Sequence, residues 1–175
     1  IALTAAVTSV LAAPAFADGH AGTMGYALAE DGKTLVTMSS IAAPSEVMTH
    51  ALDMPLRAIA YRPVTGQLIG FADGMIYEVD AMTGGLTDLG ATFMEDAMIG
   101  DGAVAFDFNN KIDAVRAVGA DGSNLVYFPD GFGDMDERAN SVRRFTDAFY
   151  VDGDNSAGAD PLIFANAYTN AIAGA

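Results

Sequence analysis

Short apolar segments alternate with polar turns along most of the chain. The apolar segments are rich in β-branched and aromatic residues, and the turns are rich in Gly, Pro, Asn and Asp. This pattern is typical of β-strands. Strands are predicted over residues 26–29, 34–38, 46–52, 56–61, 67–71, 75–80, 86–89, 103–108, 114–118, 124–128, 145–151 and 162–168, with one helical turn within the polar segment 134–144.

An Asp-Gly pair returns at intervals of 42 and 48 residues, as Asp31-Gly32, Asp73-Gly74 and Asp121-Gly122. Each pair lies between two predicted strands and supplies the positive φ that a tight hairpin turn requires. Self-similarity at a period of about 40–50 residues is the pattern of propeller-like β repeats. Four short antiparallel strands make one propeller blade.

The repeat therefore predicts an all-β, propeller-like domain over residues 26–175. Its units cover about residues 26–55, 56–101 and 102–150, and a fourth unit starts within residues 161–175. Propellers close with about four to eight blades, so three units and the start of a fourth predict an incomplete propeller. An open propeller leaves unpaired strand edges that invite pairing with another chain.

The first residues have the pattern of a secretory signal peptide. An apolar run over residues 1–11 is followed by the small-x-small sequence Ala15-Phe16-Ala17. We expect residues 1–17 to be the signal peptide and residues 18–25 to be a flexible tail. The mature protein is then exported to the periplasm or the extracellular space. No later apolar run reaches the length of about 20 residues that a membrane span needs.

The charge balance and the composition exclude several classes of partner and site. The chain has 23 acidic and 8 basic residues, a net charge of −15, and no cysteine. Nucleic acid is excluded as a partner, because binding phosphates requires clustered Lys and Arg. The absence of cysteine excludes disulfides, thiolate nucleophiles and zinc-thiolate sites.

Several motifs resemble one protein family. The chain is similar to exported bacterial proteins known as the domain of unknown function 4394. The resemblance implies a propeller-like fold and export, and it implies no site residues. This chain departs from the family pattern at Ala60, where an Asp is usual, and at Asn110, where a Pro is usual. The matching motifs are AYRPVTGQL (60–68), FDFN (106–109), IDAVR (112–116), NL (124–125), DNSAGADP (154–161) and AYTN (167–170).

One polar loop is a candidate metal site. Asp152, Asp154, Asn155 and Asp160 provide closely spaced oxygen ligands of the kind that calcium prefers. The loop is not an EF-hand, because Ala157 stands where the invariant Gly would be and the closing Glu is missing. The alternative is an exposed turn, since Asp, Asn and Ser favour turns through local hydrogen bonds. Calcium is the cofactor that this loop suggests.

Alternation along the predicted strand 103–108 places Asp107 on the face opposite Phe106 and Phe108. Asp107 then either lines a central channel or accepts hydrogen bonds from neighbouring turn amides, and the second interpretation is favoured. Arg62 and Arg116 are expected to pair with such acidic side chains.

Nothing in the sequence indicates a catalytic apparatus. There is no Gly-x-Ser-x-Gly motif, and the only histidines are His20 and His50. The leading hypothesis is an exported, non-catalytic binding or scaffold module whose ligand is a small molecule, a glycan or a protein. One alternative is a calcium-dependent propeller hydrolase. Another is a structural surface protein that associates through its sheet edges.

Overall fold

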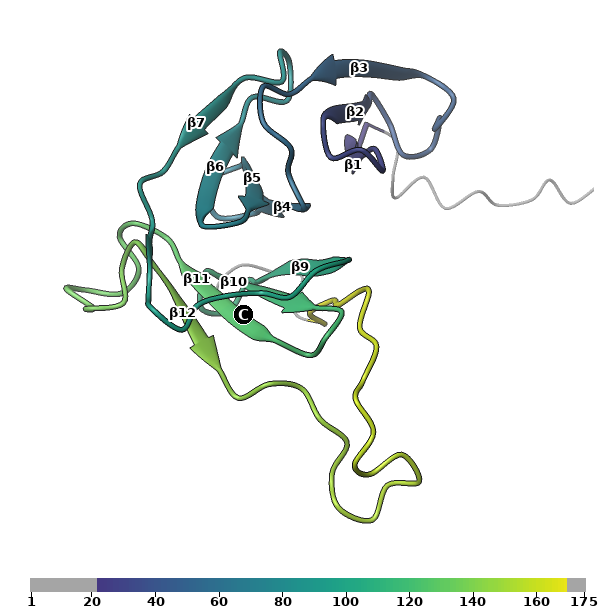
Figure 1. Ribbon diagram of the computed structural model, residues 1–175. Coiled ribbons are helices and arrows are strands. Elements are labelled where there is room, and N and C mark those ends of the chain that lie inside the picture. Colours follow the sequence, from purple (N-terminus) through teal and green to yellow (C-terminus); the bar gives the residue numbers. More distant parts are fainter. Residues whose placement is uncertain (1–21, 170–175) are drawn as a thin grey trace, which may run out of the picture.

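The computed structural model describes residues 22–169 and is all-β in that range, with twelve strands and no helix. The predicted signal peptide, residues 18–21 of the predicted tail and residues 170–175 lie outside the described residues. Within the described part of the chain, no helix has the length and hydropathy needed to cross a membrane. The strands form three sheets that follow one another along the chain (Figure 1).

The first sheet has three antiparallel strands in the order β1-β2-β3. Its hairpin turn holds the first Asp-Gly pair, and the amide of Gly32 donates to the carbonyl of Ala29 at 2.9 Å. Leu35 and Thr37 on the central strand are buried. The strands are β1 (Gly25–Leu28), β2 (Thr34–Met38) and β3 (Val47–Ala51).

The second sheet is a four-stranded antiparallel meander in the order β4-β5-β6-β7. Its central strands have almost continuous apolar sequences because both faces of the sheet are covered. The strands are β4 (Ala58–Arg62), β5 (Gln67–Ala72), β6 (Met75–Val79) and β7 (Leu86–Asp88).

The third sheet repeats this meander and adds a fifth strand at the outer edge. The order is β9-β10-β11-β12, and the short strand β8, which precedes β9 in the chain, pairs in parallel with β12. The strands are β8 (Thr92–Phe93), β9 (Val104–Asn109), β10 (Ala114–Gly119), β11 (Asn124–Phe128) and β12 (Ser141–Phe145).

Two apolar clusters hold the sheets face to face. Leu35 and Leu52 pack with Leu68 and Val79, which joins the first sheet to the second. On the other side of the second sheet, a larger cluster joins it to the third. That cluster includes Ala58, Ala60, Ile69, Phe71, Ile76, Phe108, Val115, Leu125 and Val142. The second sheet is thus the middle layer of the stack.

The Asp-Gly turns are confirmed. Gly32, Gly74 and Gly122 have φ values of 68°, 77° and 85°, each in the left-handed region that glycine tolerates. All three pairs connect consecutive strands of a meander, which is why one dipeptide marks each sheet.

Three predictions of secondary structure fail. The strand predicted over residues 145–151 is instead β12 (Ser141–Phe145), and no helical turn forms within 134–144. The strand β12 was not predicted because Arg143 and Arg144 make its sequence polar. In the fold, their guanidinium groups donate outward to the carbonyl oxygens of Glu137 and Met98. Residues 162–168 form no strand, and β8 was not predicted.

Tyr127 on β11 makes the stability of the fold sensitive to alkaline pH. Its side chain is 3% exposed, and burial raises its pKa to about 12. An unfolded tyrosine ionises near pH 10, so between about pH 10 and pH 12 the unfolded state holds fewer protons than the folded state. Stability therefore falls as pH rises through this window.

Replacing Tyr127 by Phe should reduce this loss of unfolding free energy by about 1 kcal/mol at pH 11. Urea unfolding at pH 8 and pH 11 measures the difference. Tyr150→Phe is the control, because Tyr150 is exposed. Parallel pH profiles for the wild type and Tyr127→Phe would contradict the prediction.

Candidate functional site

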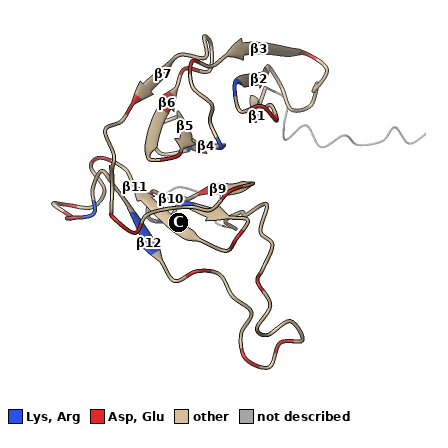
Figure 2. Cartoon of the chain, in the orientation of Figure 1, with Lys and Arg blue, Asp and Glu red and all other residues tan. Residues whose placement is uncertain are grey.

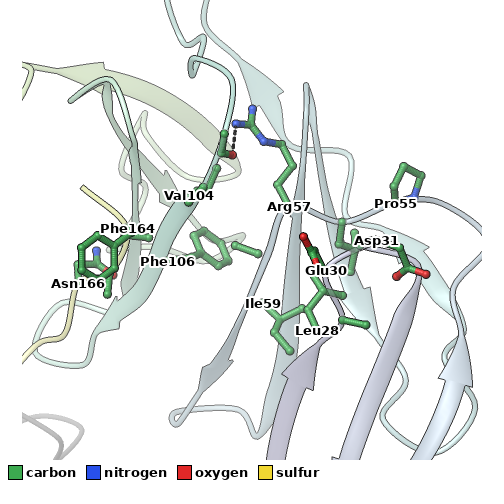
Figure 3. Close-up of a pocket in the computed structure, with 18 residues that line it drawn as sticks. Leu28, Glu30, Asp31, Pro55, Arg57, Ile59, Val104, Phe106, Phe164 and Asn166 are labelled. Carbon is green, nitrogen blue, oxygen red and sulfur yellow. Dashed lines mark hydrogen bonds between the residues drawn. The ribbon is translucent and has the colours of Figure 1, made fainter. Parts of the chain in front are cut away.

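A cleft lies where strands β1, β4 and β9 of the three sheets approach one another. Its volume is about 940 Å³. It is bordered by the β1–β2 turn, the start of β4, the start of β9 and residues 164–166 of the C-terminal segment. Figure 3 shows these four parts of the chain around the cleft.

The walls of the cleft are mostly apolar. Figure 3 shows Phe106 reaching from β9 toward the strand that carries Ile59, with Leu28 beside Ile59 and Phe164 on the far side of Phe106. Phe106 also touches the core, since its ring centroid lies 5.7 Å from that of Phe71. Core packing therefore fixes this wall, whereas the Phe164 side chain is 76% exposed.

Arg57 ties the second sheet to the third at the mouth of the cleft. Its guanidinium group donates to the Asp73 carboxylate at 2.6 Å and to the carbonyl oxygens of Gly100 and Gly102 at 2.5 and 2.9 Å. Both terminal nitrogens are thus engaged within the protein. Arg57 has a positioning role, and it leaves little donor capacity for a ligand.

The free side-chain oxygens of the cleft are hydrogen-bond acceptors. Glu30 is exposed, and no described residue forms a hydrogen bond or ion pair with its carboxylate. Asp31 accepts from the Lys33 amide at 2.8 Å and remains exposed. The side-chain oxygen of Asn166 has no hydrogen-bond partner among the described residues. The cleft thus favours ligands that donate hydrogen bonds or carry positive charge.

A second arginine clamps the same two sheets at the far end of β4. Arg62 forms a two-point contact with Asp113, at 2.9 Å from Nε and 2.5 Å from the terminal nitrogen. The hydrogen bond to Asp113 raises the pKa of Arg62. The predicted pairing of Arg62 with an acidic residue is confirmed. Two arginine clamps, one at each end of β4, hold the wall of the cleft in place.

The C-terminal segment reaches the cleft because polar groups of the third sheet hold it. The Asp107 carboxylate accepts from the backbone amide of Tyr168 at 2.7 Å, and Arg116 donates to the Tyr168 hydroxyl at 2.7 Å. Asp107 therefore accepts from a backbone amide, as favoured from the sequence, but this amide lies in the C-terminal segment and not in a neighbouring turn. Arg116 bonds to Tyr168 and Asn124 and not to an acidic side chain, so its predicted pairing is wrong.

The residues predicted to bind calcium lie together in one exposed loop. Asp154 caps a local turn by accepting from the Ser156 amide at 2.8 Å, and Asp152, Asn155 and Asp160 are exposed. Within residues 22–169, no three His, Cys, Asp or Glu side chains are grouped closely enough to hold a metal ion. The structure does not assemble this loop into a ligand set, and the calcium site stays a prediction.

Sequence reasoning missed the cleft residues Glu30, Arg57 and Asn166. Glu30 and Arg57 stand next to strand ends that the sequence did locate, beside the Asp-Gly turn and before β4. Their meeting depends on how the sheets stack, and no local pattern encodes that. Asn166 reaches the cleft through contacts about 50 residues apart in sequence, such as its bond to the Arg116 carbonyl at 3.4 Å.

Comparison with known proteins gives a family and no function. A search of curated proteins finds no significant match. A family model described as a domain of unknown function, DUF4394, matches residues 34–175, which contain most of the three sheets and the C-terminal segment. The chain therefore belongs to the DUF4394 family.

Proposed function

We propose that the chain is an exported, propeller-like binding module whose central cleft takes a small cationic ligand. The observation that carries the proposal is the convergence of three sheets on one cleft whose unengaged polar groups are acceptors. Such concave sites with apolar walls and a few polar groups are where proteins usually bind small molecules.

The arrangement of the sheets supports the propeller-like part of the proposal. Each sheet is a meander, and the first strand of each, β1, β4 and β9, contributes to or adjoins the cleft (Figure 1). In a propeller the blades stack face to face around a central channel in the same way. The three sheets of the described chain form no closed ring.

The ligand class follows from the chemistry of the lining. Glu30 and Asp31 attract positive charge, and Leu28, Ile59 and Phe106 offer an apolar surface to a hydrocarbon body. The net charge of −15 adds a long-range attraction for cations. Figure 2 shows that acidic residues lie mainly in turns and loops, so this attraction acts over much of the surface. An aliphatic polyamine combines both features and is the probe of choice.

Calorimetric titration with spermidine at physiological salt tests the proposal. We expect saturable binding that Glu30→Gln weakens by roughly three- to tenfold, which is about 0.7–1.4 kcal/mol. Asp152→Asn is the matched control, because it removes the same charge from an exposed loop and should leave binding unchanged. Equal losses in the two variants would indicate non-specific attraction, and an absence of binding would reject the ligand class.

A further inference from the structure

A smaller pocket lies between the second and third sheets, at the opposite end of β4 from the cleft. Its volume is about 290 Å³, close to the lower end of the range of about 300–1,000 Å³ for small-molecule sites. Its walls come from the ends of β4 and β11, from β5, and from the turns after β7 and before β12. It shares no lining residue with the cleft, so this polar pocket is a separate site.

A buried hydroxyl group in the wall of the polar pocket has only a weak acceptor. The side chain of Tyr127 is 3% exposed. Its hydroxyl donates to the side-chain oxygen of Asn140 at 3.5 Å, well beyond the usual distance of about 2.7–2.8 Å between two such oxygens. Because a poorly satisfied buried hydroxyl costs free energy, a ligand atom that accepts from Tyr127 is stabilised in this pocket.

The side chain of Asn140 is held in place by the chain around it. Its amide nitrogen donates to the carbonyl oxygens of Leu89 and Gly90 at 3.3 and 3.1 Å. Its backbone carbonyl accepts from the Thr92 amide at 2.9 Å. Its φ of 51° lies in the left-handed region, which Asn tolerates better than most residues. The side-chain oxygen of Asn140 is therefore positioned before a ligand binds.

Arg62 and Asp130 add donors and a further acceptor to the lining. Arg62 uses three of its five N–H groups, two toward Asp113 and one toward Gln67. Its other two N–H groups donate to no described residue. The Asp130 carboxylate is exposed at the pocket and accepts no hydrogen bond from the described part of the chain. The polar pocket thus offers donors and acceptors together.

A neutral, hydroxyl-rich ligand matches this lining. A hydroxyl group donates and accepts hydrogen bonds, so it can use both kinds of group. Ile69 and Leu89 provide an apolar patch for the C–H groups of a ring. The ion pair with Asp113 neutralises Arg62, and Asp130 adds a negative charge, so an anion is disfavoured. A cation would meet the guanidinium group of Arg62.

We propose that the polar pocket binds one six-membered ring of a sugar or a cyclic polyol. Hydroxyl oxygens of the ring accept from Arg62 and Tyr127. Hydroxyl hydrogens of the ring donate to Asn140 and Asp130. The small volume favours a single ring, so a longer glycan enters only with its terminal sugar.

Amide chemical shifts of the full chain, followed in titrations with D-glucose, D-galactose, D-mannose and myo-inositol, test this inference. We expect saturable shifts at Ile69, Leu89 and Asn140 with at least one of these probes. The methyl glycoside of a sugar that binds distinguishes the two sources of the ring. Equal binding of the glycoside is expected for the end of a glycan, and lost binding is expected for a free sugar.

Two variants and their matched controls locate the binding. Tyr127→Phe removes the hydroxyl and keeps the aromatic ring, and it should weaken binding about three- to tenfold. Asp130→Ala should weaken binding to a similar extent, and it leaves the core intact if Tyr127→Phe disturbs packing. Tyr77→Phe changes a buried tyrosine outside the pocket, and Asp134→Ala changes an exposed aspartate of the same loop. Both controls, and Glu30→Gln in the cleft, should bind as the wild type does.

Three results would overturn the inference. The first is the absence of saturable shifts around the polar pocket with all four probes. The second is a loss of binding in the control variants equal to that in Tyr127→Phe and Asp130→Ala. The third is binding of glycine, a zwitterion, without binding of any sugar or polyol. None of these results depends on spermidine, so this inference and the proposed cleft ligand fail separately.

Discussion

Replacing Phe71 by alanine is expected to lower the free energy of unfolding by about 3–5 kcal/mol. Phe71 is 1% exposed and lies in the cluster that joins the second sheet to the third. Its ring also packs against Phe106 and Phe93, with centroids 5.7 and 6.2 Å away. The substitution removes buried apolar area and leaves a cavity that three parts of the chain share.

Urea unfolding measures this loss, and Phe149→Ala is the matched control. The Phe149 side chain is 67% exposed, so its truncation should change stability by no more than about 0.5 kcal/mol. A loss below about 1 kcal/mol for Phe71→Ala would mean that the second and third sheets are not packed as described. Phe106 packs against Phe71, so the substitution should also weaken the binding of a ligand in the cleft.

Gly32→Ala is expected to cost about 2–4 kcal/mol, the second largest effect. Gly32 has a φ of 68°, which costs other residues about 1–2 kcal/mol. A Cβ at this position would also collide with the carbonyl oxygen of Leu56, and backbone overlap adds about 1–3 kcal/mol. The Gly32 carbonyl accepts from the Leu56 amide at 2.8 Å, so this turn is bonded to the segment that leads into β4.

Gly74→Ala separates the two contributions to that cost. Gly74 occupies the Asp-Gly turn between β5 and β6 with a φ of 77°, and an added Cβ would meet no atom within 4 Å. Gly74→Ala should therefore lower the free energy of unfolding only by the conformational contribution. Equal losses for Gly32→Ala and Gly74→Ala in urea unfolding would show that the β1–β2 turn does not contact Leu56.

Local sequence rules predicted the parts of this fold that local chemistry decides. The Asp-Gly pairs marked hairpins because their glycines need positive φ, and alternation placed Phe108 in the core and Asp107 on the opposite face. The same rules failed at β12, where Arg143 and Arg144 made a strand look like a polar loop. Pairing with β11 and outward bonds of the guanidinium groups outweigh that composition.

The candidate site was beyond sequence reasoning for a different reason. Its residues come from four segments spread between residues 28 and 166, and their meeting depends on the stacking of whole sheets. The aspartates that the sequence did single out, Asp152, Asp154 and Asp160, are close in sequence and stay in an exposed loop. Proximity along the chain was a poor guide because the loop folds on itself through local turns only.

The cleft between the inner strands is the proposed ligand site. The most direct measurement is a spermidine titration followed by amide chemical shifts in the folded protein. We expect saturable shifts concentrated at residues 28–32, 56–59 and 103–106, around the cleft. Shifts confined to exposed acidic loops such as residues 152–160, with none around the cleft, would contradict it.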